Sequence, residues 1–153
     1  MASRYLPELL DVEPYEVREL SAFLAQAGYR PLPRNEGRRI AYHDSCHMLR
    51  ELHIADQPRR LLRASGAELV SFSRPDLCCG FGGTFAVRQP EVSLAMADDK
   101  LSGAPGAPGA AGAGAIVSAD PGCLMHLRGR AQRVGSGLRI VHLATALARG
   151  VGG

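Results

Sequence analysis

The sequence contains no Trp, and aromatic residues make up only 5% of its 153 residues. Leu, Val and Ala must therefore fill most of the core. Its 18 basic residues include a single Lys, and the Arg residues are scattered along the chain rather than gathered in one block. Nucleic-acid-binding surfaces normally combine a concentrated basic face with stacking aromatic side chains. We therefore expect no nucleic-acid partner.

Long apolar runs are also missing. No apolar segment approaches the roughly 18 residues that a membrane-spanning helix requires, and residues 1–7 lack the apolar stretch of a secretory signal peptide. We therefore expect a cytoplasmic protein without a membrane span. Cysteine is scarce as well, with four residues in the chain. In the reducing cytoplasm, cysteines are better explained as metal ligands or redox groups than as structural disulfides.

Helical and strand-like patterns alternate along the chain. Helices are predicted over 14–27, 57–65, 90–101, 120–134 and 142–149, and short apolar strands over 38–43, 67–72, 115–119 and 138–141. This order predicts an α/β fold with a small, mainly parallel four-stranded sheet and helices on both faces. We assign 1–37 to an N-terminal helix and connector and 38–150 to the main domain. Within that domain, the Gly-, Ala- and Pro-rich run at 102–115 is expected to be a flexible surface loop.

The four cysteines follow the ends of three predicted strands. Cys46 follows the first strand, Cys78 and Cys79 follow the second, and Cys123 follows the third. The carboxyl ends of parallel strands lie at one edge of a sheet, where ligands bind. We therefore expect the four thiols to converge at that edge.

The chemistry of these thiols favours a soft metal. Thiolates select zinc, copper(I) or iron–sulfur clusters. Cys123 is expected at a helix N-terminus, a position that lowers the pKa of a thiol. Gly80, Gly82 and Gly83 allow a tight turn after Cys79, and their N–H groups would donate hydrogen bonds to thiolate or sulfide. Two adjacent cysteines cannot both point into a core from one strand, which argues against purely structural thiols.

Histidine offers further candidate ligands. His126 follows Cys123 by three residues, on the same side of a helical turn, so it is a candidate ligand or hydrogen-bond donor to sulfur. For the other histidines (His43, His47, His53 and His142) a surface or hydrogen-bonded polar role is the default expectation. His47 and His142 are the better candidates among these four. Thiol–disulfide chemistry at Cys78 and Cys79 is a third, weaker option beside cluster binding and zinc binding.

Four stretches carry a specific family resemblance. They are Tyr42-His43-Asp44-Ser45-Cys46-His47, Leu77-Cys78-Cys79-Gly80-Phe81-Gly82-Gly83-Thr84-Phe85, Pro90-Glu91-Val92-Ser93 and Ala119-Asp120-Pro121-Gly122-Cys123-Leu124-Met125-His126. Together they resemble the CCG cysteine-rich domain of heterodisulfide reductases and of the glycolate oxidase iron–sulfur subunit. They are closest to the C-terminal half of the L-lactate utilisation protein A branch. The general family pattern ends in Cys-x-x-Cys, whereas this chain has His126 at the last position.

The resemblance implies a function. It implies an iron–sulfur-binding, electron-transferring subunit of a cytoplasmic L-lactate or glycolate oxidation complex, with iron–sulfur and flavin-type proteins as partners. Cys46, Cys78, Cys79 and Cys123 would hold a 4Fe–4S cluster, of non-cubane type in heterodisulfide reductase, with His126 as an additional ligand. The alternative is a zinc-stabilised module that docks a partner without redox chemistry. We do not expect the chain to be catalytic on its own.

Overall fold

Four short parallel strands form the centre of the molecule in a computed structural model that describes residues 17–72, 77–104 and 114–152. The strands are β1 (Arg39–Tyr42), β2 (Glu68–Val70), β3 (Ala115–Ser118) and β4 (Arg139–His142). The sheet has the order β2-β1-β3-β4, and every neighbouring pair is parallel. The predicted α/β fold with a four-stranded parallel sheet is therefore confirmed.

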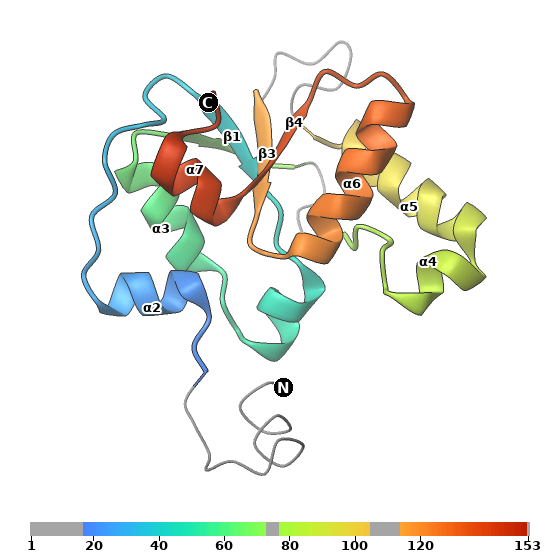
Figure 1. Cartoon of the computed structure of the whole chain (residues 1–153), viewed down its shortest axis with the longest axis horizontal. Coiled ribbons are helices and arrows are strands. Elements are labelled where there is room, and N and C mark those ends of the chain that lie inside the picture. Colours follow the sequence, from blue (N-terminus) through green and yellow to red (C-terminus); the bar gives the residue numbers. More distant parts are fainter. Residues whose placement is uncertain (1–16, 73–76, 105–113, 153) are drawn as a thin grey trace.

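Helices cover both faces of this sheet (Figure 1). The described helices are α2 (Leu20–Gln26), the π-helical turn η1 (His47–Glu51), α3 (Asp56–Ala64), α4 (Thr84–Arg88), α5 (Pro90–Ser102), α6 (Pro121–Arg133) and α7 (Leu143–Arg149). Helices α3 and α7 pack on one face, and α5 and α6 pack on the other. No helix within the described ranges is long and apolar enough to cross a membrane.

Alternation along the strands separates the two cores. Ile40 and Tyr42 of β1 face α3 and α7, whereas Ala41 faces α5 and α6. On the α5–α6 side, Ala41 joins Ile116 of β3 and Ile140 of β4 in a buried cluster. Because successive strand side chains point to opposite faces, the residue two positions after Ala41 should also point toward α5 and α6. That residue is His43.

Several elements differ from the sequence-based expectation. The helix expected over 14–27 starts at Leu20 in the described part, because the Glu19 side chain caps it by accepting from the Ala22 N–H; 14–16 lie outside the described residues. The short helix α4 and the turn η1 were not predicted. A loop was expected at 102–115. In the structure α5 ends at Ser102 and β3 begins at Ala115, and 105–113 lie outside the described residues.

A buried amide ties the connector before β1 to both helices of the α3–α7 face. Asn35 is fully buried, and its Nδ2 donates to Ser65 Oγ at 2.8 Å and to the Ala146 carbonyl at 2.9 Å. Its Oδ1 accepts from the Val151 N–H at 2.9 Å. The bonds to Ala146 and Val151 join segments that are more than 100 residues apart in the chain. Together these contacts hold the layer that supports β1 from behind.

The substitution Asn35→Ala should lower the free energy of unfolding by about 2–3 kcal/mol, because it leaves buried donors and acceptors without partners. Urea denaturation followed by circular dichroism measures this change. Arg60→Ala, at an exposed position of α3, serves as the control and should stay within about 0.5 kcal/mol of the wild type. An Asn35→Ala protein as stable as this control would contradict the role assigned to the amide.

Candidate metal centre

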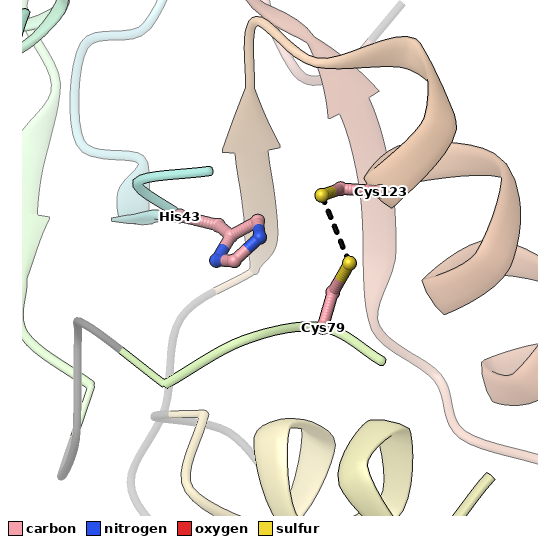
Figure 2. A group of neighbouring side chains, drawn as sticks. All are labelled: His43, Cys79 and Cys123. Atoms are coloured by element: carbon pink, nitrogen blue, oxygen red, sulfur yellow. Dashed lines mark hydrogen bonds between the residues drawn. The ribbon is translucent and has the colours of Figure 1, made fainter. Parts of the chain in front are cut away.

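Two thiols meet at the carboxyl edge of the sheet. Cys79 lies in the turn after β2, and Cys123 lies in the first turn of α6, directly after β3. Their sulfur atoms are 2.9 Å apart and share a hydrogen bond (Figure 2). Both side chains are buried, with 2% and 6% of their surfaces exposed. Pairs of thiols brought this close from separate segments are typical of metal sites and of redox-active dithiols.

His43 completes a group of three candidate ligands. Its ring points toward the two sulfurs (Figure 2), and the ligand atoms of His43, Cys79 and Cys123 all lie within 4.8 Å of one another. His43 is fully buried, and neither ring nitrogen makes a hydrogen bond of good geometry within the described part of the chain. A buried imidazole without hydrogen bonds is costly, and a metal ion bound through one nitrogen would remove part of that cost.

The backbone around His43 explains its position. The His43 N–H donates to the Val117 carbonyl at 2.8 Å, so the ladder between β1 and β3 continues one residue past the strand. The next residue, Asp44, is buried and forms a two-point ion pair with Arg59 of α3, including Nη1–Oδ1 at 2.6 Å. Phe72 packs edge-on against the His43 ring, with centroids 6.4 Å apart. These contacts fix the imidazole on the α5–α6 face.

The pKa values of the two thiols are shifted in opposite directions. Hydrogen bonding from Cys123 lowers the pKa of Cys79, and His43 and the Phe81 N–H lower it further, against the opposing effect of burial. The pKa of Cys123 is raised, first by its hydrogen bond to the Cys79 thiolate and then by burial. The two buried thiols therefore titrate as a pair that shares a proton between its sulfurs.

The raised pKa of Cys123 differs from the lowered pKa that the sequence predicted for a thiol at a helix N-terminus. The sequence placed Cys123 at a helix N-terminus, and the structure does so, with Asp120 as the N-cap. However, the Cys123 N–H is bonded to the Asp120 carboxylate at 2.9 Å. The charge of Asp120 also raises the pKa of Cys123. The neighbouring thiolate and burial therefore outweigh the helix N-terminus.

The glycines after Cys79 allow the turn to pass close to α5. Gly80 has φ +88°, and a Cβ atom there would lie 2.4 Å from the Ser93 carbonyl oxygen. The Gly80 N–H donates to Cys78 Sγ at 3.4 Å, as expected for a glycine that serves the thiols. Gly82 and Gly83 also have positive φ, and Gly83 is the residue before α4. These two shape the turn, while Gly80 and Phe81 supply the described N–H groups near sulfur.

The remaining sequence-predicted ligands lie farther from the buried pair. Cys78 is half-buried and Cys46 is exposed, and neither belongs to the group of three ligands within 4.8 Å. Both are near enough to matter electrostatically. Burial is the main cause that raises the pKa of Cys78, and the charges of Cys79 and Cys46 raise it further. The four thiols thus comprise an inner pair, Cys79 and Cys123, and an outer pair, Cys46 and Cys78.

The histidine that lies nearest the thiols is not one of those that the sequence favoured as metal ligands. His47, which the sequence favoured, is half-buried, and its Nδ1 lies 3.0 Å from Glu51 Oε2 on η1. His142 caps α7, since its Nδ1 accepts from the Ala144 N–H at 3.1 Å. His126 Nε2 lies 3.2 Å from Ser93 Oγ. His43, for which a surface or hydrogen-bonded polar role was expected, is the histidine that lies beside the thiols. Its place two residues after Ala41 on a buried strand was the available signal.

The donor set fits a soft or borderline metal. One imidazole and two sulfurs suit zinc or iron, whereas the hard cations Mg²⁺ and Ca²⁺ prefer oxygen ligands. The described residues near the sulfurs also supply N–H donors, from Gly80 and Phe81. The geometry supports a metal cofactor held by His43, Cys79 and Cys123.

Comparison with known proteins identifies a cysteine-rich family whose match includes the site. The family described as the CCG cysteine-rich domain matches residues 40–128, which are more than half of the chain and include all four cysteines. The chain belongs to the CCG cysteine-rich domain family. The matched region starts in β1 and ends in α6, so it contains every residue of the candidate metal centre.

Several curated proteins resemble this CCG chain. Lactate utilization protein A of Geobacillus kaustophilus is 43% identical over 110 residues, covering 71% of this chain and 44% of the relative. The protein of the same name from Oceanobacillus iheyensis is 36% identical over 131 residues, covering 84% and 52%. Lactate utilization protein A 2 of Bacillus cereus is 37% identical over 114 residues, covering 74% and 46%. The matches span about half the length of these relatives.

The substitution Gly80→Ala should destabilise the Cys78–Cys79 turn. The new Cβ would meet backbone of α5, and the positive φ adds strain of roughly 1–3 kcal/mol. We expect a lower midpoint of thermal unfolding and weaker metal binding, measured by calorimetry and by metal titration. The control is Gly129→Ala in α6, where a Cβ has open space. Equal behaviour of the two variants would refute the close-approach argument.

Proposed function

We propose that this chain is an iron–sulfur-binding, electron-transferring module of a cytoplasmic system that oxidises L-lactate or a related hydroxy acid such as glycolate. The observation that supports it most directly is the convergence of His43, Cys79 and Cys123 at the carboxyl edge of the sheet, within 4.8 Å. The relatives named for lactate utilisation supply the proposed substrate class. The other subunits of the system, of iron–sulfur and flavin type, would be the partners.

The residues have distinct proposed roles. Cys79 and Cys123 would be the buried anchors of the cluster, beside the imidazole of His43. Cys46 and Cys78 would bind it from the outer side. When bound, an iron–sulfur cluster supplies one-electron transfer. The N–H groups that donate toward Cys78 and Cys79 stabilise added negative charge, and such hydrogen bonds raise the reduction potential of a cluster.

Proton release should accompany metal binding. The two buried sulfurs share a hydrogen bond, and both must be deprotonated to coordinate a metal. The proton shared between the two sulfurs is thus one that the metal displaces.

A specific observation favours a second candidate function. One histidine and two cysteines in close contact form a donor set that zinc also uses in structural sites. The chain would then be a zinc-stabilised CCG module that docks a partner without redox chemistry. The two functions differ in metal content and in the presence of sulfide.

Anaerobic reconstitution with iron and sulfide tests the cluster. The wild type should bind iron and acid-labile sulfide in equal amounts, and Cys79→Ser should lose most of both. Cys46→Ser, at the exposed outer position, should lose less than Cys79→Ser. His43→Ala should weaken binding strongly, because it removes one of the three converging ligands. Its control, His47→Ala, lies outside that group and should not weaken binding. Protein that binds zinc alone, without sulfide, would refute the cluster and favour the zinc-stabilised module.

Growth on L-lactate tests the substrate class. A strain without this gene should fail to grow with L-lactate as the only carbon source and should grow normally on glucose. The wild-type gene should restore growth, and the Cys79→Ser gene should not. Undiminished growth of the deletion strain on L-lactate would contradict the proposed system, while leaving the metal centre itself to the reconstitution assay.

A further inference from the structure

A serine of α5 connects the cysteine turn to α6. Ser93 Oγ donates to the Gly80 carbonyl at 2.7 Å, and the same oxygen lies 3.2 Å from His126 Nε2. Ser93 is 1% exposed. A hydroxyl has one proton, and Gly80 takes it, so the contact with His126 requires Nε2–H as the donor. We call this pair of hydrogen bonds the Ser93–His126 bridge.

The bridge determines which nitrogen of His126 carries a proton. A protonated Nε2 has no lone pair for a metal ion, and it is directed at Ser93 Oγ and at the Ser93 carbonyl, 3.4 Å away. The other nitrogen, Nδ1, keeps a lone pair, but His126 does not belong to the group of ligand atoms within 4.8 Å of one another that includes Cys79. The position where the general CCG pattern has a second thiol is therefore occupied here by a hydrogen-bond donor.

Packing places the bridge beside the metal centre. The Phe81 ring lies 6.1 Å from the His126 ring, measured between centroids, and a Cβ atom on Gly122 would collide with Phe81. A Cβ atom on Gly80 would likewise collide with Ser93 of α5. The turn that carries Cys79 is thus held between α5 and α6 by van der Waals contact and by the bridge.

The bridge ends on the helix that carries the other thiol. His126 follows Cys123 by one turn of α6. The path from Cys79 through Gly80, Ser93 and His126 therefore returns to the helix of Cys123. Two thiols from different segments keep a fixed separation only if their backbones are fixed to one another. The bridge provides this link with two hydrogen bonds.

We propose that His126 and Ser93 are positioning residues, which fix the Cys79 turn against α6 and so set the separation of the Cys79 and Cys123 sulfurs, and that His126 is not a metal ligand. The proposal rests on the metal centre of the proposed function. It concerns how the inner thiol pair is prepared for a metal and does not depend on which metal is bound in the cell.

Cobalt(II) titration of the reduced, metal-free chain under anaerobic conditions tests the proposal. Absorption bands of bound Co²⁺ report the ligand set, and the titration gives the affinity. His126→Gln keeps an amide N–H in reach of Ser93 Oγ, whereas His126→Leu and Ser93→Ala remove the bridge. We expect His126→Gln to bind Co²⁺ within about twofold of the wild type, and the other two variants to bind it about 3- to 10-fold more weakly, the effect of losing one hydrogen bond.

The spectrum and the double variant separate positioning from ligation. The bands of all three variants should match those of the wild type, whereas His43→Ala should shift them. Ser93→Ala combined with His126→Leu should bind no more weakly than either single variant, because both remove the same bridge. A shifted spectrum in both His126→Gln and His126→Leu, with Ser93→Ala unchanged, would make His126 a ligand and overturn the proposal. Wild-type affinity in Ser93→Ala and His126→Leu would also overturn it.

Two further controls keep these results decisive. Thermal unfolding of each metal-free variant shows whether it folds. If Ser93→Ala does not fold, the comparison of His126→Leu, which removes the bridge, with His126→Gln, which keeps it, still tests the proposal. A wild-type chain that binds no Co²⁺ would instead refute the metal centre of the proposed function. The failure of the centre and the failure of the bridge are therefore distinguishable.

Discussion

The hydrogen bond between the Cys79 and Cys123 sulfurs is the contact on which the candidate metal centre depends. It joins a turn that follows β2 to a helix that follows β3, and these strands are not neighbours, because β1 lies between them. The thiols must therefore meet over the end of β1, which is where His43 lies. The parallel order of the sheet thus places an imidazole between two sulfur-bearing segments.

This arrangement is costly for the protein without metal. His43 is buried with neither ring nitrogen well hydrogen-bonded among the described residues, and an unsatisfied buried polar group costs about 1–3 kcal/mol. The thiols of Cys79 and Cys123 are buried as well. Leu or Ala would pack at these positions without burying an unpaired polar group. A metal that takes both the imidazole nitrogen and the sulfurs converts this cost into binding energy, and it couples the site to folding.

Much of the fold, and part of the site, could be predicted from the sequence. The alternation of helices and strands indicated the parallel sheet, and the cysteines after three strand ends indicated the edge. His43 was missed because ligand spacing was judged along the chain, whereas its relation to the thiols comes from strand alternation with Ala41 and from β1 lying between β2 and β3. The exposure of Cys46 depends on the π-helical turn η1, for which the sequence has no clear signal.

The division into inner and outer thiols connects the site with its surroundings. Cys79 and Cys123 are held by neighbouring groups, through His43, Asp120 and the Ser93–His126 bridge. Cys46 and Cys78 are reached by solvent. A cluster bound to both pairs would be anchored on its inner side and accessible on its outer side, as one-electron exchange with a partner requires. A structural zinc ion is normally held by four ligands, so it would take the three inner ligands and only one more. Binding through both Cys46 and Cys78 is therefore the property that distinguishes an electron-transfer module from a docking module.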